Sequence, residues 1–165
     1  MCTFVSTRSA QIWLLGSSIS SFYPEQIPST SERFGGKTVP EVKTTPDWNS
    51  FIQLAPLKPA LCRSRLVVVA DASVLTHQDI AQMRQLRERY NWFSAAVFFD
   101  KPDLGKVIHA FNSDLAAYSA INDSVEEIGK MIELIAAGRT YYTAGFCDLL
   151  RQYGFPIEEL HYQNR

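Results

Sequence analysis

The sequence predicts an α/β domain with a parallel sheet, because apolar runs and helical patterns alternate along its second half. Three runs, at residues 66–70, 94–99 and 116–121, predict short strands, and the first of them is apolar on both faces. Strands of this kind are typical of a sheet that is covered by helices on both sides. Each run is followed by apolar residues at helical spacing, so we expect right-handed strand–helix–strand crossovers.

The expected helices carry apolar side chains at intervals of three and four residues. The first begins after Thr76, where Asp79 three residues later predicts a capping box. The second begins near Leu104, and the third ends at Gly138, a residue type that is typical of helix ends. We expect one more short helix, with Thr143 as its cap.

The first third of the chain is less regular. Residues 12–15 form an apolar run that ends at Gly16, which predicts another central strand. Residues 20–59 contain six prolines, each of which interrupts regular hydrogen bonding. Within this region we expect an edge strand at residues 37–43 and a helix at residues 46–54.

The composition is that of one ordinary globular domain of 165 residues, 46% of them hydrophobic and 20% charged. A formal net charge of −1 argues against a basic DNA-binding module. The cysteines Cys2, Cys62 and Cys147 lack metal-ligand spacing and are odd in number, which argues against a zinc site and a disulfide framework. No run approaches the ~20 apolar residues of a membrane span. We expect a cytoplasmic protein that has no cofactor, metal or membrane contact.

Two groups of arginine residues, at positions 63–65 and 84–89, could bind phosphate. Acidic residues lie close to the second group, and helical arginines usually form a solvated face, so we favour a solvated face. The histidines His77, His109 and His161 lie far apart in the sequence, and we expect no shared role for them.

Residues 117–128 (AYSAINDSVEEI) and 135–143 (IAAGRTYYT) carry a family resemblance. They are similar to the end of NarL/FixJ-type (LuxR-type) response-regulator receiver domains, in which G-Y-L-L-K precedes D-x-S-x-E-E-L and the last helix closes on A-A-G-x-x-Y-x-S. The resemblance implies a flavodoxin-like (CheY-like) fold, a doubly wound parallel sheet of five strands, with an atypical first third. It implies a pseudo-receiver domain at residues 1–138. Residues 139–165 would form a linker helix and tail toward a possible helix-turn-helix domain, which the residues after Gly154 do not contain.

In such receivers an aspartate at a strand end accepts a phosphoryl group, and the resemblance places Asp71 there, with Asp100 as a second candidate. The supporting residues are absent: Ser17 and Ser18 stand where acidic Mg²⁺ ligands are expected, Phe99 where a hydroxyl is expected, and Ile121 where a lysine is expected. We therefore expect poor Mg²⁺ binding and no efficient phosphoryl transfer. The simpler interpretation of Asp71 is a strand-end aspartate that caps a loop.

This pattern of losses resembles the branch of the family that includes the curli and biofilm regulators, in which signalling is thought to proceed without a complete phosphorylation pocket. We expect a non-enzymatic regulatory domain of a bacterial LuxR-type transcription regulator, which acts as a homodimer or by contact with other regulatory proteins. It would reach DNA only through a domain outside this chain. The resemblance implies a dimer surface whose candidate residues are Leu104, Ile108, Phe111, Ile128, Met131 and Ile135.

Two alternative functions stay open. The first is a genuine phosphoacceptor at Asp71, in which Asp100 or Asp103 replaces the missing acidic pair. The second is a small-molecule sensor that uses residues 20–59 as a lid, because long loops in compact domains are often functional.

Overall fold

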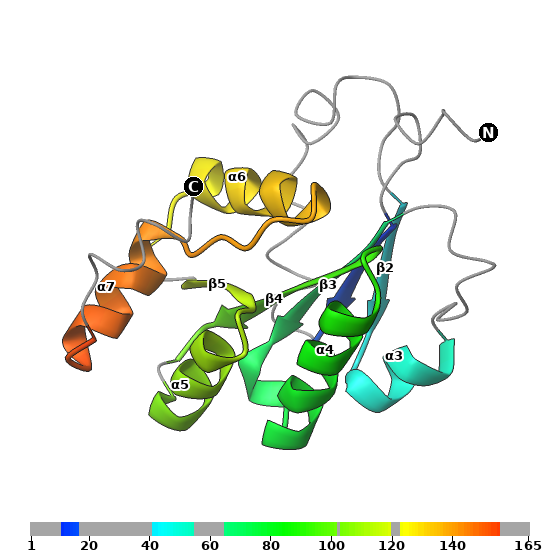
Figure 1. Cartoon of the computed structure of the whole chain (residues 1–165), viewed down its shortest axis with the longest axis horizontal. Helices are drawn as coiled ribbons and strands as arrows, with labels where there is room; N and C mark the ends of the chain where they lie inside the picture. Colours follow the sequence, from blue (N-terminus) through cyan, green and yellow to red (C-terminus); the bar gives the residue numbers. More distant parts are fainter. Residues whose placement is uncertain (1–10, 17–40, 55–64, 102, 120–122, 156–165) are drawn as a thin grey trace.

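Five parallel strands form one sheet, as the family resemblance implies, and their order is β2-β1-β3-β4-β5 (Figure 1). The computed structural model describes residues 11–16, 41–54, 65–101, 103–119 and 123–155. Its strands are β1 (Gln11–Leu15), β2 (Glu41–Thr45), β3 (Leu66–Asp71), β4 (Phe93–Phe99) and β5 (Ala116–Ser119). Its helices are α3 (Trp48–Leu54), α4 (His77–Arg89), α5 (Leu104–Asn112), α6 (Val125–Ala136) and α7 (Ala144–Gln152), with the short 3-10 helix η1 (Ala72–Val74).

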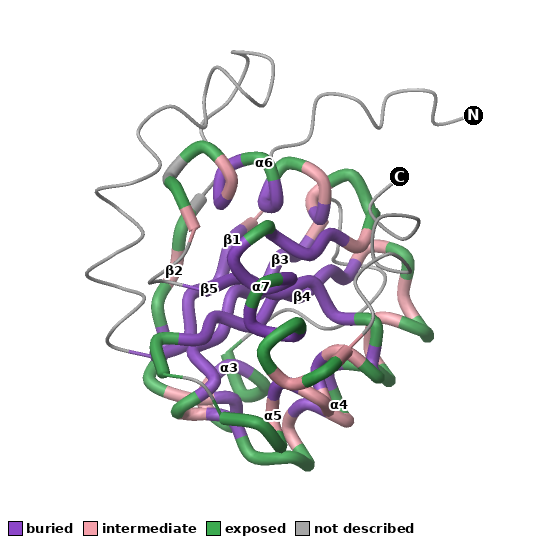
Figure 2. Tube along the Cα trace, turned by 90° about the vertical axis from the view of Figure 1, so that its left-hand side faces the viewer, coloured by how far each residue is buried: buried purple, intermediate pink, exposed green. Residues whose placement is uncertain are grey.

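The described helices cover the sheet on both faces, which confirms the doubly wound arrangement. One core contains α3, α4, α5 and α7, and the other contains α6. Successive residues of a strand face opposite sides, so Val68 lies in the first core, and Val67 and Val69 lie in the second. Figure 2 shows the buried strands between α6 and the helices of the other face.

Side-chain caps mark where α4 and α7 begin, and a glycine follows the end of α6. Thr76 and Asp79 form the predicted capping box: Thr76 Oγ1 accepts from Asp79 N at 3.1 Å, and Asp79 Oδ2 accepts from Thr76 N at 2.9 Å. Thr143 Oγ1 accepts from Phe146 N at 3.3 Å at the start of α7. After α6, Gly138 has a φ of 87°, a conformation that glycine adopts at little cost. These helix predictions are confirmed.

The last helix packs beside β5. Tyr142 forms a parallel bridge with Ala117 of β5, and the Phe146 ring stacks on that of Phe99 with the centroids 5.6 Å apart. Phe146 is fully buried, so α7 belongs to the core of this domain. The division at residue 138 and the linker role of residues 139–165 stay predictions.

A carboxylate holds the amino end of α7. Asp123 accepts hydrogen bonds from the backbone nitrogens of Ser119 and Gly145, each at 2.7 Å, and from the Thr143 hydroxyl. Negative groups are favourable at a helix N-terminus. Because Ser119 ends β5 and Gly145 lies in the first turn of α7, this side chain ties the helix to the sheet.

Two strands differ from their predicted bounds by more than one residue. β2 covers Glu41–Thr45, later than the predicted strand at 37–43, whose first four residues lie outside the described part of the chain. β5 ends at Ser119, and residues 120–122 also lie outside the described ranges. In the part of the chain that the structure describes, no helix is long and apolar enough to cross a membrane.

Candidate functional site

A pocket of about 520 Å³ opens at the carboxyl ends of β3 and β4. Ligands of open α/β sheets bind at this edge. Three acidic and two basic side chains line the pocket together with small residues: Asp71, Ala72, Ser73, Asp100, Lys101, Asp103 and Lys106. The pocket therefore brings together both predicted phosphoacceptor candidates, Asp71 and Asp100.

Asp71 is the last residue of β3, and only 2% of its surface is exposed. Its Oδ1 accepts a hydrogen bond from the backbone nitrogen of Ser73 at 2.9 Å, and Asp71 is the N-cap of η1. The carboxylate therefore caps the loop that follows the strand, as the simpler interpretation of the sequence holds.

Gly16 lies next to Asp71, because Leu15 of β1 pairs with Ala70 of β3. A Cβ atom at position 16 would lie 2.8 Å from the Cβ of Asp71, closer than side-chain atoms approach one another. Its φ of 108° is also a conformation that favours glycine. No acidic residue fits at position 16 on this backbone. Ser17 and Ser18, the predicted substitutes for the acidic pair, lie outside the described residues.

Lys106 supplies a positive charge that sequence reasoning missed. Its Nζ donates to the carbonyl oxygen of Ala72 at 2.7 Å, which joins the first turn of α5 to η1. Lys101 also lines the pocket. The resemblance directs attention to a lysine after the fifth strand, at Ile121, which lies outside the described residues. The available signal was the position of Lys101 two residues after a predicted strand, at the edge where parallel strands end.

The described residues do not fit the Mg²⁺ ion that a receiver pocket holds. Magnesium prefers several free oxygen ligands. Here Asp71 Oδ1 and Asp103 Oδ1 accept from the backbone nitrogens of Ser73 and Lys106, at 2.9 Å and 3.1 Å. Across the described ranges, no three His, Cys, Asp or Glu side chains gather closely enough to hold a metal. Two ammonium groups share the pocket with the aspartates. The donor set is therefore a poor one for a divalent cation.

Four predicted site residues lie in the core. Phe99 is 1% exposed and stacks on Phe146, so its side chain points away from the pocket. Ile128, Met131 and Ile135 are at most 2% exposed and pack against the sheet. Their prediction as dimer-surface residues is wrong, because the apolar face of α6 is the face that covers its own sheet.

The α5 candidates for the dimer surface differ in exposure. Leu104 is 47% exposed, whereas Ile108 and Phe111 are half-buried. The Phe111 ring lies 5.6 Å from the rings of both Tyr142 and Phe155, counted between centroids. The segment that includes α7 therefore already covers part of this helix.

The fold also brings together two histidines to which the sequence assigned no role. His77 of α4 and His109 of α5 lie with their Nδ1 atoms 3.0 Å apart. Burial lowers the pKa of His109, and the nearby charges of His77 and Arg84 lower it further. No local signal could reveal this pair, since its members are 32 residues apart.

No protein-family profile and no curated protein matches the sequence. The isolated REC domain of RcsB from Salmonella enterica serovar Typhimurium, solved in the presence of phosphomimetic BeF3⁻, is similar in structure. The TM-score is 0.59 at 13% identity, over 86% of this chain and 99% of that chain. This chain has the fold of a response-regulator receiver domain.

Two further solved structures agree with the receiver fold. A two-component response regulator of the LuxR family from Aurantimonas sp. SI85-9A1 gives a TM-score of 0.58 at 16% identity, over 88% of this chain and 98% of that chain. A putative pilus assembly-related protein from Burkholderia pseudomallei K96243 gives a TM-score of 0.51 at 11% identity, over 84% of this chain and 96% of that chain. These likenesses confirm the receiver fold that the NarL/FixJ resemblance implies.

Proposed function

We propose that this receiver is a non-enzymatic regulatory domain of a LuxR-type transcription regulator, which signals by protein–protein contact without efficient phosphorylation of Asp71. The observation that carries the proposal is the contact between Gly16 and Asp71. It leaves no room for a side chain at position 16, directly after β1 and beside the aspartate that would react.

The charges around Asp71 support this proposal. Phosphoryl transfer depends almost entirely on positioning and on stabilising the charge of the transferred group. A pocket without a full set of carboxylate ligands is a poor site for the cation that balances this charge. The Lys106 ammonium group could act on a phosphoryl oxygen, but it donates to the Ala72 carbonyl. The hydrogen bond of Lys106 thus stabilises the loop that follows β3.

The proposal includes self-association in the cytoplasm, with contacts to DNA made only through a separate domain. Leu104 is the exposed candidate for a self-association surface, at the start of α5. The half-buried Ile108 lies one turn further along the same helix. A homodimer through this part of α5 would leave the side chains that α6 packs against the sheet undisturbed.

A genuine phosphoacceptor is the second candidate function, because Asp100 and Lys101 line the same pocket as Asp71. In this alternative Asp100 or Asp103, which also lines the pocket, would replace the missing acidic pair, and Lys101 would supply a positive charge. The two functions differ in whether the phosphoryl donor changes the association state of the protein.

Sedimentation velocity with and without acetyl phosphate and Mg²⁺ separates the two functions. We expect a concentration-dependent dimer whose sedimentation is the same in both conditions, and the same in the Asp71→Asn variant. A shift in association that requires acetyl phosphate and disappears in Asp71→Asn would overturn the proposal and favour the phosphoacceptor. A monomer at every concentration would overturn the self-association part.

A further inference from the structure

A second groove, of about 470 Å³, lies at the other end of β3 from Asp71. It is formed by the residue before β3, the carboxyl end of α4, the start of β4 and the end of α6. Its lining residues are Arg65, Arg87, Glu88, Tyr90, Asn91, Phe93, Ser94, Ala137 and Gly138. The groove therefore contains one member of each arginine group that the sequence analysis singled out.

Arg65 is held in this groove by neutral oxygen atoms. Its Nη1 donates to the Asn91 carbonyl at 2.6 Å and to Ser94 Oγ at 3.3 Å. Burial lowers the pKa of its guanidinium group. Among the described residues no carboxylate pairs with it. A half-buried positive charge is costly unless an opposite charge pairs with it.

Gly138 keeps the space next to Arg65 open. A Cβ atom at position 138 would lie 3.1 Å from Nη2 of Arg65, and the φ of Gly138 is 87°. The backbone of Gly138 can therefore lie close to the guanidinium group without a side chain covering it.

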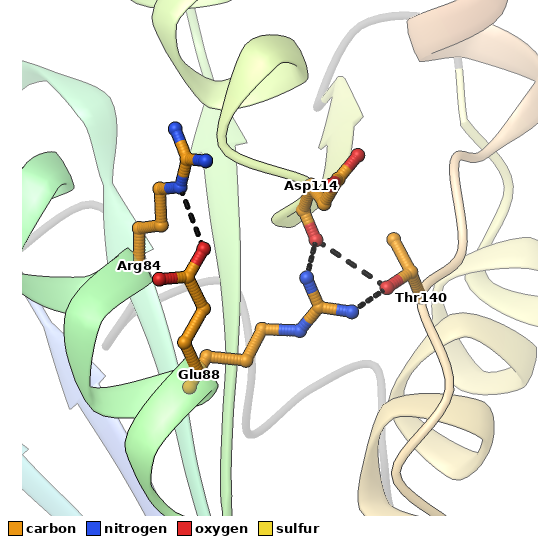
Figure 3. Close-up of polar contacts among 5 residues, drawn as sticks. Arg84, Glu88, Asp114 and Thr140 are labelled. Atoms are coloured by element: carbon orange, nitrogen blue, oxygen red, sulfur yellow. Dashed lines mark hydrogen bonds and ion pairs between the residues drawn. The ribbon is translucent and has the colours of Figure 1, made fainter.

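Arg87 adds a second positive charge without a carboxylate partner among the described residues. Its Nη1 and Nη2 donate to the Asp114 carbonyl and the Thr140 hydroxyl, which lie side by side in Figure 3. Both oxygens are uncharged, so these bonds position Arg87 but leave its charge unbalanced. The contacts tie α4 to the turn before β5 and to the segment after α6.

Glu88 is the acidic side chain in the lining, and it is turned toward another partner. Its Oε1 accepts from Nε of Arg84 at 2.9 Å, as Figure 3 shows. Glu88 therefore pairs with an arginine that does not line the groove. The two guanidinium groups in the groove outnumber the single, already paired carboxylate.

We propose that this groove binds a phosphate-type oxyanion, free or as the phosphate group of a larger molecule. The planar guanidinium group of arginine suits phosphate oxygens, and the bonds it forms with them are charge-assisted. One face of the Tyr90 ring stacks on Trp92, with the centroids 4.7 Å apart, and the Arg89 guanidinium lies 5.5 Å from the Tyr90 ring. Because Tyr90 is occupied in this way, the phosphate group, and not a stacked base, carries the binding.

If Arg65 had only a structural role, a different result would be expected from phosphate titrations. By donating to the Asn91 carbonyl just beyond α4, Arg65 also stabilises the end of that helix. If that were its whole function, phosphate would neither bind to the protein nor stabilise it, with or without the Glu88 charge.

Calorimetric titrations with inorganic phosphate, pyrophosphate and adenosine monophosphate at constant ionic strength test the proposal. We expect all three to bind, pyrophosphate most tightly, and adenosine monophosphate no more tightly than pyrophosphate. Arg65→Gln should weaken pyrophosphate binding by at least about tenfold. Glu88→Gln should strengthen it by about threefold, because it removes the negative charge beside the groove. Arg151→Gln, on α7, is the matched control and should leave affinity unchanged.

Three results would overturn this inference. They are no binding at millimolar concentrations, unchanged affinity in a folded Arg65→Gln variant, and binding that is lost in Lys106→Met but kept in Arg65→Gln. The last result would place the anion in the Asp71 pocket. If Arg65→Gln does not fold by circular dichroism, Glu88→Gln decides: unchanged or weaker binding there contradicts the proposal. If adenosine monophosphate bound most tightly of the three, the claim that the phosphate group carries the binding would be contradicted.

Discussion

Gly16 and Asp71 lie side by side at the carboxyl ends of β1 and β3, where a Cβ atom at position 16 would stand 2.8 Å from the Cβ of Asp71. Asp71 itself is the N-cap of η1. At the edge of the sheet where a receiver performs its chemistry, the backbone of Gly16 therefore lies directly against the side chain of Asp71. This relationship excludes a side chain at position 16, the first position after β1, without a shift of Asp71.

The contact predicts that Gly16→Ala lowers the free energy of unfolding by more than about 1 kcal/mol, the usual cost of a positive φ for a residue with a side chain. The part of the loss beyond this cost comes from the displacement of Asp71 by the new Cβ atom. Gly154→Ala is the matched control, because Gly154 has a φ of 84° and nothing within 4 Å of its added Cβ. Urea unfolding of both variants measures the difference. Equal losses would contradict the close contact.

The hydrogen bond from Lys106 to Ala72 predicts a second change in the free energy of unfolding. Lys106→Met keeps the aliphatic stem and removes the hydrogen bond to the Ala72 carbonyl, so we expect a loss of about 1 kcal/mol in unfolding free energy. Lys101→Met is the control, since Lys101 lines the same pocket and is exposed. A Lys106 variant as stable as the Lys101 variant would show that the bond contributes nothing.

The packing of α7 predicts that it contributes to the stability of the receiver core. Phe146→Ala removes a fully buried ring that contacts Phe99 and Tyr142, and should cost about 3–5 kcal/mol. Leu104→Ala, at a position that is 47% exposed, should cost less than about 1 kcal/mol. Thermal and urea unfolding measure both losses. A small effect of Phe146→Ala would mean that α7 is only loosely attached.

The Asp123 carboxyl, which ties α7 to β5, predicts that the free energy of unfolding depends on pH. Burial raises the pKa of the Asp123 carboxyl above 3.8, against the opposing effect of its hydrogen bonds with Thr143, Ser119 and Gly145. A carboxyl with a raised pKa contributes stability that is complete below 3.8 and is lost as the pH rises through its folded-state pKa.

The unfolding free energy of the wild type, taken relative to Asp123→Asn, should therefore fall as the pH rises from 3.8 toward neutrality. The difference cancels the other carboxyl groups, which both proteins share. Urea titrations at a series of pH values supply this difference. A difference that grows with pH would mean that the hydrogen bonds to the carboxylate outweigh its burial.

The regular elements of the second half could be predicted because their signals are local. Apolar runs marked β3 and β4, and the Thr76 and Asp79 pair marked the start of α4. Their order along the chain then left few ways to arrange a parallel sheet. The dimer surface, in contrast, was implied by the family resemblance, and the apolar spacing of a helix does not reveal what covers its apolar face. Met131 of α6 has the spacing of an interface residue, yet it is fully buried against its own sheet.

The pocket could be predicted only in part. Asp71 follows from its place at a strand end, but the lysines come from the segment after β4 and not from the fifth strand. The bond from Lys106 to Ala72 joins residues 34 positions apart and depends on how two loops meet. The role of Gly16 likewise depends on its neighbour in the sheet, which the sequence of β1 does not reveal.

Intact mass after incubation with acetyl phosphate and Mg²⁺ tests the central claim most directly, with Asp71→Asn as the control. Because the described residues of the pocket are a poor donor set for Mg²⁺, we expect the mass of the wild-type protein to remain unchanged, as in the variant. A gain of one phosphoryl group in the wild type that is absent from Asp71→Asn would contradict the claim that this receiver signals without phosphorylation.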